Sequence, residues 1–269
     1  MKPLVFVAIL AKQKEALLQA WLDSLEAWDY PKDRMIIYIR ANNSTDRTNE
    51  ILKQWVKKNE RAYKKFFEDY SDVDTPIQNY GVHEWNAERF KVLGKIRNDS
   101  IRVAQASGAD YYFVCDIDNF LLPHTLSNMV DHGLTCTAPL LRYAVEHDND
   151  DHKPYSNYHN IASPQGYYQD NFAYYRILNG EVRGLIKCDV VHCTYLLRKD
   201  ILDKVAYVDD TDRYEYVIFS DTLRKHNIPQ YLDNTEVYGY LTLTENLEAV
   251  TKWMGILNEA RNNRPLPNN

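Results

Sequence analysis

The chain has 269 residues, 45% hydrophobic and 26% charged, which is ordinary for a globular protein and long enough for one large α/β core or two small ones. Its net charge of −6 argues against a nucleic-acid partner, because the phosphate backbone favours a basic surface. The apolar stretch within residues 1–10 is too short to cross a membrane, and we expect no membrane span.

The N-terminal part of the chain alternates between strand and helix patterns. Residues 4–10 form a continuous apolar run, as in a strand buried on both faces of a parallel sheet. Apolar residues then recur at helical spacing over 16–25, and a second strand is predicted at 34–39. A second helix follows through Trp55 and Val56. This order predicts a parallel sheet.

A polar loop precedes a helix and the third strand. Residues 71–86 are polar, with proline and glycine, and we predict a loop there. A helix is predicted over 88–107, ended by Gly108. It leads into a strong third strand at 111–115.

The C-terminal part is less regular. Residues 143–184 are rich in Tyr, Asn, Asp and His with little periodicity, which predicts a long functional or mobile loop. A strand at 190–197 and a helix at 217–226 follow. Residues 262–269 are expected to form a disordered tail.

The triplet Asp116-Ile117-Asp118 stands where the third strand ends. Residues two apart on a strand point the same way, roughly 6.5 Å apart, so these carboxylates repel unless a cation or strong donors lie between them. Mn²⁺ or Mg²⁺ would suit them, because such ions take oxygen ligands and share them with phosphates. Ligands of open α/β sheets bind at the carboxyl ends of strands, where the triplet falls. The alternative is a triplet that caps a helix or decorates a loop.

Other polar residues are expected near the triplet. Residues 10–15 and 42–46 follow the first two strands and should lie at the same edge of the sheet. Arg97, in the helix before the triplet, would contact the base or diphosphate of a nucleotide. The alternative is that Arg97 is a solvated helix charge.

Several blocks of the sequence, in order, resemble the procollagen galactosyltransferase family. The similar blocks are the D-x-D-N-hydrophobic segment at 113–121, Y-S-N-Y at 155–158, Q-G-Y-Y at 165–168, V-H-C-T-Y-L at 191–196 and V-Y-G-Y-L at 237–241. The resemblance spans roughly residues 3–245 and covers the first of that family's two glycosyltransferase domains.

The resemblance implies a single Rossmann-like α/β domain of the GT-A type over residues 1–261, with a mostly parallel central sheet. Residues 1–120 would form the nucleotide-binding half and 121–261 the acceptor side. It also implies a UDP-sugar donor, a Mn²⁺ (or Mg²⁺) ion, and transfer of galactose to hydroxylysine of a collagen-like protein. The family works in the endoplasmic reticulum lumen; no signal or retention sequence is recognisable here, so a cytoplasmic location stays equally open.

Site residues follow from the same resemblance. Asp118 would ligate the metal, and Asp116 would touch the ribose or the metal. The other residues expected at the nucleotide sugar are Ala8, Leu10, Asn42, Arg97 and Ile117, and those expected to line the acceptor side are Tyr155, Asn157, Tyr167 and His192. An equally good interpretation of His192 is a satisfied histidine in a buried strand.

The sequence departs from the family at two places. The family has an Asp-Asp pair where this chain has Tyr214-Glu215. It also has a histidine beyond the Tyr-Gly segment, a natural third metal ligand, where this chain offers Glu245 or Glu248 as oxygen ligands. Either the site is rebuilt with carboxylates or the domain has lost activity.

An acceptor hydroxyl is a poor nucleophile near neutral pH and needs a general base. Our hypothesis is that Glu215 is that base, with Asp212 and Asp221 as rivals. The alternative places Glu215 on the surface at a helix start, where acids favour the helix dipole. Three functions therefore stay open: a galactosyltransferase acting on hydroxylysine, a transferase with another sugar such as glucose or with a glycan acceptor, and a non-catalytic domain that binds nucleotide sugar or acceptor.

Overall fold

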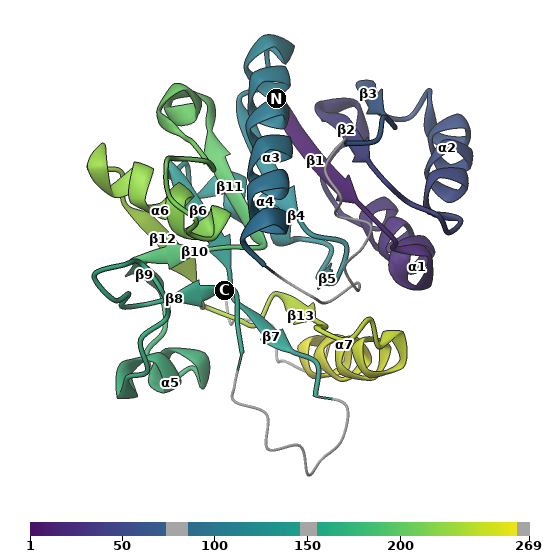
Figure 1. The fold of residues 1–269 in the computed structure, drawn as a ribbon. Coiled ribbons are helices and arrows are strands. Elements are labelled where there is room, and N and C mark those ends of the chain that lie inside the picture. The colour runs from purple at the N-terminus through teal and green to yellow at the C-terminus, as the bar shows by residue number, and fades with distance from the viewer. Residues whose placement is uncertain (74–85, 146–154, 263–269) are drawn as a thin grey trace.

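The computed structural model describes residues 1–73, 86–145 and 155–262 (Figure 1). Its strands are β1 (Val5–Ala11), β2 (Met35–Ala41), β3 (Lys65–Asp69), β4 (Tyr111–Cys115), β5 (Asn119–Leu121), β6 (Cys136–Pro139), β7 (Leu141–Tyr143), β8 (Tyr158–His159), β9 (Leu185–Cys188), β10 (Val190–Val191), β11 (Thr194–Arg198), β12 (Gln230–Asp233) and β13 (Gly239–Leu241). Its helices are α1 (Glu15–Glu26), α2 (Thr48–Asn59), α3 (Ala87–Ser107), α4 (Thr125–Asp131), α5 (Phe172–Leu178), α6 (Glu215–Lys225) and α7 (Leu247–Asn262), with 3₁₀ turns at Lys32–Arg34 and Lys199–Lys204.

The described residues form an eight-stranded central sheet in the order β3-β2-β1-β4-β11-β6-β12-β9. The strands β1, β2, β3 and β4 are parallel to one another, and β6 is parallel to β12. Only β11 and β9 run antiparallel to their neighbours in this sheet. The predicted mostly parallel α/β domain is thereby confirmed.

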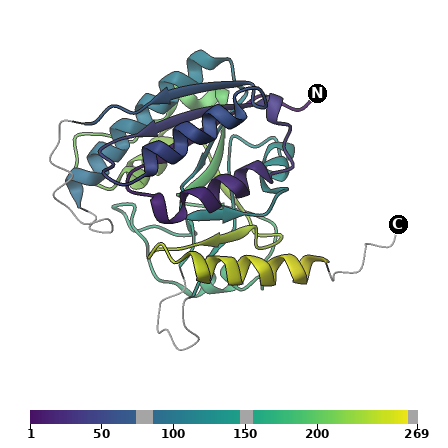
Figure 2. The same ribbon diagram turned by 90° about the vertical axis from the view of Figure 1, so that its right-hand side faces the viewer.

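Helices cover both faces of this sheet (Figures 1 and 2). One core packs β1 and β2 against α1, α2 and α4, and the other packs them against α3, α5 and α6. The strand β1 shows why: Val5, Val7 and Ile9 enter the first core, while Phe6 and Ala8 enter the second. A strand buried on both faces needs the continuous apolar run that the sequence shows there.

The first helix–strand units follow the predicted bounds closely. The helix α3 begins after Asn86, whose side-chain oxygen accepts a hydrogen bond from Arg89 N at 3.0 Å. It ends at Gly108, whose φ of 80° lies in the left-handed region that glycine adopts most easily. These two caps direct the chain into β4 and fix where the triplet after β4 lies.

A smaller three-stranded sheet, β5-β13-β7, lies beneath the carboxyl end of β4 and carries α7 on its outer side (Figure 2). The backbone N–H of Thr242 donates to the carbonyl of Asp118 at 3.0 Å, which ties this sheet to the triplet. None of the helices in the described ranges combines the length and apolar character that crossing a bilayer requires.

Two sequence predictions for the C-terminal part need correction. The long loop predicted at 143–184 contains β8 and α5, and α5 buries Tyr174, Ile177 and Leu178 at helical spacing within an otherwise polar segment. The single strand predicted at 190–197 is two strands, β10 and β11, because the backbone turns at Cys193 with a φ of 63°. Residues 74–85 and 146–154 of the predicted loops, and 263–269 of the predicted tail, lie outside the described residues.

Candidate functional site

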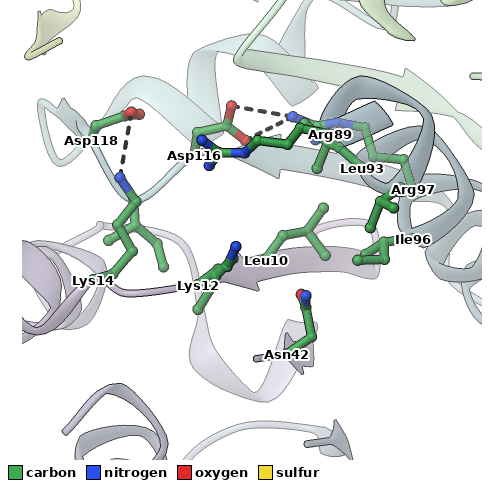
Figure 3. A pocket seen from close by; sticks show the side chains of 13 residues that line it. Leu10, Lys12, Lys14, Asn42, Arg89, Leu93, Ile96, Arg97, Asp116 and Asp118 are labelled. Carbon is green, nitrogen blue, oxygen red and sulfur yellow. Dashed lines mark hydrogen bonds and ion pairs between the residues drawn. The ribbon is translucent and has the colours of Figure 1, made fainter. Parts of the chain in front are cut away.

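A pocket with about 800 Å³ of open space lies at the carboxyl ends of β1, β2 and β4, against the first half of α3 (Figure 3). The residues that line it are Leu10, Ala11, Lys12, Lys14, Asn42, Arg89, Val92, Leu93, Ile96, Arg97, Asp116, Ile117 and Asp118. The segments after the first two strands therefore meet the triplet at one edge of the sheet, as the topology of an open α/β sheet predicts.

The triplet itself is a turn. The strand β4 ends at Cys115, and Asn119 N donates to the carbonyl of Asp116 at 2.9 Å. The expectation that the two carboxylates share one strand face is therefore wrong, although both still line the pocket. The N–H of Asp116 donates to the carbonyl of Cys193 at 3.0 Å, so the break between β10 and β11 holds the start of the turn.

The buried Arg97 and Glu215 and the partly exposed Asp116 form a charged group that we call the Arg97 cluster. Arg97 Nη2 donates to both carboxylate oxygens of Asp116, at 3.0 and 3.1 Å. Its Nε lies 3.7 Å from Glu215 Oε1, and only 3% of the arginine side chain is exposed. Arg97 is therefore a buried bridge between α6 and the triplet, which contradicts the alternative of a solvated helix charge.

Glu215 begins α6 and is 5% exposed, so it is at a helix start but not on the surface. Burial raises the pKa of its carboxyl from 4.5 to about 7, with Arg97 opposing the shift and Asp116 adding to it. Its Oε2 atom is buried and has no hydrogen-bond partner among the described residues. A carboxyl with a pKa near neutrality can exchange a proton at physiological pH, which is the property a general base needs.

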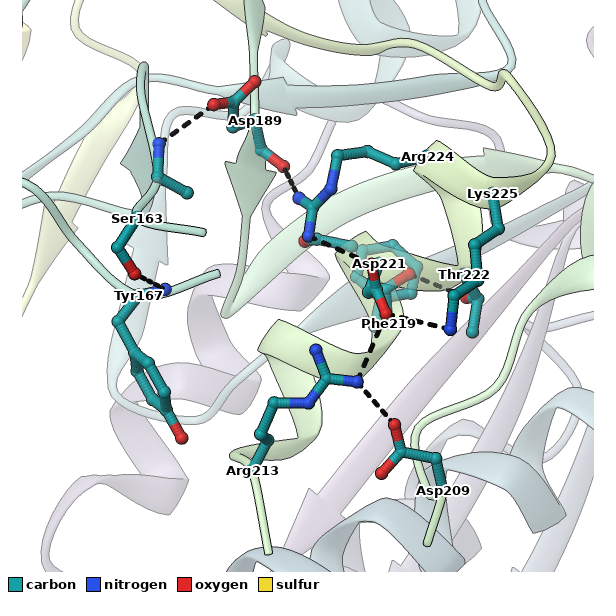
Figure 4. A network of polar contacts seen from close by, with 12 residues as sticks. Ser163, Tyr167, Asp189, Asp209, Arg213, Phe219, Asp221, Thr222, Arg224 and Lys225 are labelled. Carbon is teal, nitrogen blue, oxygen red and sulfur yellow. Dashed lines mark hydrogen bonds and ion pairs between the residues drawn. The ribbon is translucent and has the colours of Figure 1, made fainter. Parts of the chain in front are cut away.

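The two rival bases lie elsewhere. The side chain of Asp212 is 79% exposed and pairs with Lys91 at 3.2 Å. Asp221 lies among Arg213, Arg224 and Lys225 (Figure 4). Neither Asp221 nor Glu215 lines the described pocket, but Glu215 lies 3.7 Å from the pocket residue Arg97. Burial raises the pKa of Asp221, but hydrogen bonds from Lys225 and Arg213 outweigh it and leave the pKa below its usual value.

Lys14, Asp118 and Glu245 form a second charged group, the Lys14 cluster, at the other side of the triplet. Lys14 Nζ donates to Glu245 Oε1 at 2.7 Å. It also lies 3.9 Å from Asp118 Oδ2 (Figure 3). Burial raises the pKa of Asp118 to about 6, against the opposing effect of Lys14 and with a further increase from Asp116. Asp118 and Glu245 thus enclose one position for a positive charge, and an ammonium group holds it.

The expected metal ligands fit an ion only in part. Among residues 1–73, 86–145 and 155–262, no three His, Cys, Asp or Glu side chains gather closely enough to hold a metal ion. Asp116 is in contact with Arg97, Glu245 is in contact with Lys14, and Glu248 is exposed in the first turn of α7. The oxygens of Asp118 and Glu245 are the donors that Mn²⁺ or Mg²⁺ prefers, but Lys14 would have to move before an ion could reach both.

The other residues predicted for the nucleotide sugar divide between pocket and core. Leu10, Asn42 and Ile117 line the pocket together with Arg97. Ala8 is 1% exposed and packs in the second core, two residues before Leu10 in β1.

None of the residues predicted for the acceptor side lines the described pocket, and two of them are buried. Asn157 is buried and structural, because its amide accepts from Leu141 N at 3.0 Å and donates to the carbonyl of Pro139 at 2.8 Å. His192 is also buried; burial lowers its pKa well below 6.5, and its Nδ1 lies 2.8 Å from Cys193 Sγ. That histidine is neutral near pH 7.

Aromatic rings connect the remaining acceptor-side residues to Glu215. The ring of His192 lies 5.9 Å from that of Tyr155 and 5.1 Å from that of Tyr216. The ring of Tyr167 lies 5.1 Å from that of Tyr214. Because Tyr214 and Tyr216 flank Glu215 in the chain, the predicted acceptor-side rings gather next to the predicted base.

Three basic pocket residues were not singled out from the sequence. Lys12, Lys14 and Arg89 line the pocket alongside Arg97. The signal for the two lysines was present, because they directly follow a buried strand at the edge where ligands bind. Four basic side chains against two carboxylates give the pocket lining a net positive charge, although Arg97 and Lys14 are already paired with carboxylates. A net positive lining favours an anionic ligand.

The fold is that of the GT-A glycosyltransferases. It is similar to S. aureus TarS in complex with UDP-GlcNAc, with a TM-score of 0.54, 15% identity, and coverage of 89% of this chain and 58% of that one. It is also similar to the mannosyltransferase PcManGT from Pyrobaculum calidifontis in complex with GDP-Man and Mn²⁺, with a TM-score of 0.55, 12% identity, and coverage of 99% and 66%. At these identities the likeness shows the fold alone.

The sequence comparison gives the particular family. A sequence model described as "Glycosyltransferase family 25, N-terminal domain" matches residues 2–252, and the chain belongs to this family. Mouse procollagen galactosyltransferase 2 is 33% identical over 254 residues, which are 90% of this chain and 39% of that protein. The human inactive glycosyltransferase 25 family member 3 is 28% identical and covers 90% of this chain and 41% of that protein. The chain thus spans about two fifths of the length of the curated relatives it matches.

Proposed function

We propose that the chain transfers a hexose, with galactose as the first candidate, from a UDP-sugar to hydroxylysine of a collagen-like protein, with inversion at the anomeric carbon. The observation that carries this proposal is the Arg97 cluster, in which one arginine of the pocket wall also contacts a buried carboxyl with a pKa near 7. The galactosyltransferase relatives support the sugar and the acceptor.

The pocket supports a nucleotide-sugar donor. Its walls are apolar along α3, as a base and ribose require, and its rim carries Lys12, Lys14 and Arg89 for the diphosphate. Asn42 would contact the uracil, and Asp116 would face the ribose. The fold neighbours that hold UDP-GlcNAc and GDP-Man support the same class of donor.

In the reaction, the acceptor oxygen forms a bond to the anomeric carbon while the bond from that carbon to the diphosphate breaks. UDP leaves with the electron pair, so negative charge builds up on its terminal phosphate. Basic side chains already oriented around that position would stabilise the charge without reorganisation. A divalent ion held by Asp118 and Glu245 would supply the same stabilisation as a Lewis acid.

The proton of the acceptor hydroxyl would pass to Glu215. Its carboxylate must be ionised to accept the proton, and a pKa of about 7 leaves a substantial ionised fraction at neutral pH. Arg97 would fix the carboxylate in place through its contact at 3.7 Å. The rings of Tyr214, Tyr216 and His192 around it would form the acceptor face.

Two other functions are alternatives to this one. A transferase that uses another sugar or a glycan acceptor would use the same pocket. A non-catalytic domain that only binds nucleotide sugar is the second, and the relative named as inactive gives it support.

The test is release of UDP from a panel of UDP-sugars, with and without a hydroxylysine peptide or glycan acceptors, compared between the wild-type protein and Asp118→Ala. Each reaction is run with Mn²⁺ and with EDTA. We expect turnover of one donor that depends on the peptide and falls at least tenfold in the variant. Binding of UDP without turnover of any donor, with every acceptor, would overturn the transferase proposal and favour the binding domain.

A further inference from the structure

The Lys14 cluster brings together three distant parts of the chain. Lys14 precedes α1 in the segment after β1, Asp118 lies in the turn after β4, and Glu245 lies between β13 and α7. The side chains of Lys14 and Glu245 are 17% and 16% exposed, so their contact is mostly enclosed. A positive charge is therefore held beside the carboxylate that the sequence predicts to bind a metal ion.

The backbone fixes all three members. Lys14 N donates to Thr48 Oγ1 at 2.8 Å, which anchors the lysine to the start of α2. The carbonyl of Asp118 accepts from Thr242 N at 3.0 Å. Glu245 has a φ of 59°, an uncommon conformation for a glutamate, and this sharp turn of the backbone places its carboxylate against Lys14. The cluster is built by the fold and is not a chance contact of long surface side chains.

We propose that Lys14 is a built-in cation that occupies the metal position between Asp118 and Glu245, so that a divalent ion binds there only by displacing the lysine. A divalent ion and an ammonium group repel each other strongly at the distances of this cluster. The Oε1 atom of Glu245 is also engaged by the hydrogen bond from Lys14. Both effects weaken metal binding.

Only the use of this charge in sugar transfer rests on the proposed function. The occupation of the metal position by Lys14 does not depend on it. In sugar transfer, the ammonium group of Lys14 would donate to an oxygen of the leaving diphosphate and supply the charge neutralisation that a divalent ion would otherwise supply. Lysine suits this exchange, because its ammonium group is a compact charge on a flexible stem.

The test is a titration of the protein with Mn²⁺, followed by the electron paramagnetic resonance signal of the free ion, without any nucleotide or sugar. The two informative variants are Lys14→Gln, which removes the charge and keeps a hydrogen-bond donor, and Lys14→Arg, which keeps both. The matched control is Lys58→Gln, which removes a lysine paired with Glu26 at 3.1 Å outside the pocket. Thermal unfolding confirms that each variant is folded.

We expect Mn²⁺ to bind Lys14→Gln at least ten times more tightly than it binds the wild-type protein, Lys14→Arg and Lys58→Gln. Adding Glu245→Gln to Lys14→Gln should abolish most of the gain, because it removes one of the two carboxylates that the ion would use. Equal Kd values for Lys14→Gln and Lys14→Arg would overturn the inference. Because no sugar is present, this result is independent of whether the protein is a transferase.

Discussion

Two carboxylates of one triplet line the same pocket but contact different cations. Asp116 belongs to the Arg97 cluster, where a 3% exposed arginine contacts both of its oxygens. Asp118 belongs to the Lys14 cluster, where the ammonium group lies 3.9 Å away; its side chain is 31% exposed, close to the 28% of Asp116. Arginine offers rigid, planar donors and lysine a mobile point charge. The comparison suggests that the Arg97 cluster holds the site in shape, while the Lys14 cluster is the part that rearranges when a ligand enters.

The largest expected effect comes from removing the buried arginine. Arg97→Gln leaves the buried Glu215 and the partly exposed Asp116 without their shared cation, which should cost about 3 kcal/mol in the free energy of unfolding. Urea denaturation measures it. Arg102→Gln, on the same helix but 73% exposed and paired with Asp99, is the matched control and should change stability by less than about 1 kcal/mol. Similar losses for the two variants would contradict the structural role of the Arg97 cluster.

The two halves of the triplet should differ in the same measurement. Asp116→Asn weakens charge-assisted hydrogen bonds to a buried arginine and should cost about 1.5–3 kcal/mol. Asp118→Asn leaves Lys14 its closer contact with Glu245, so the cost should stay below about 1 kcal/mol. If Asp118→Asn proved the more destabilising of the two, the comparison between the clusters would be reversed.

Glu215 gives a pH-dependent prediction for the Arg97 cluster. Its pKa is raised from 4.5 in the unfolded chain to about 7 in the folded protein, so the folded state binds the proton more tightly. The stabilisation is complete below pH 4.5 and is lost as the pH rises through 7. Glu215→Gln lacks this loss and should exceed the wild-type protein in stability by roughly 1–3 kcal/mol at pH 8. Urea denaturation at pH 5 and pH 8 tests it, and a variant less stable than the wild type at pH 8 would refute the raised pKa.

Features of the fold that depend on local pattern could be predicted from the sequence. The apolar run of β1, the helical spacing and Gly108 of α3, and the position of the triplet after β4 each follow from neighbouring residues. The pocket edge followed from topology, because parallel strands bring their carboxyl ends together. The helix α5 was missed, because its three buried positions stand within a polar segment too short for a periodic signal.

The charged clusters could not be predicted from local sequence patterns or from the topology of the sheet. The contact between Lys14 and Glu245 joins residues 231 positions apart, and the Arg97 cluster depends on how α6 packs against α3. Burial of Glu215 is equally a tertiary effect, since acids at helix starts are ordinarily solvated. The break at Cys193 had no local signal, because a positive φ favours glycine or asparagine. Sequence patterns therefore identified several of the residues at the site, but they did not identify which of these residues are in contact.

The most direct test of the account compares UDP release by the wild-type protein and Glu215→Gln, with the donor selected from the panel and a hydroxylysine peptide as acceptor. The affinity of each protein for UDP, measured by calorimetry, serves as the control for an intact donor pocket. We predict unchanged UDP binding and a transfer rate at least 100-fold lower in the variant, in keeping with the usual contribution of a general base. A variant that transfers at the full rate would show that Glu215 is not the base and would contradict the central claim.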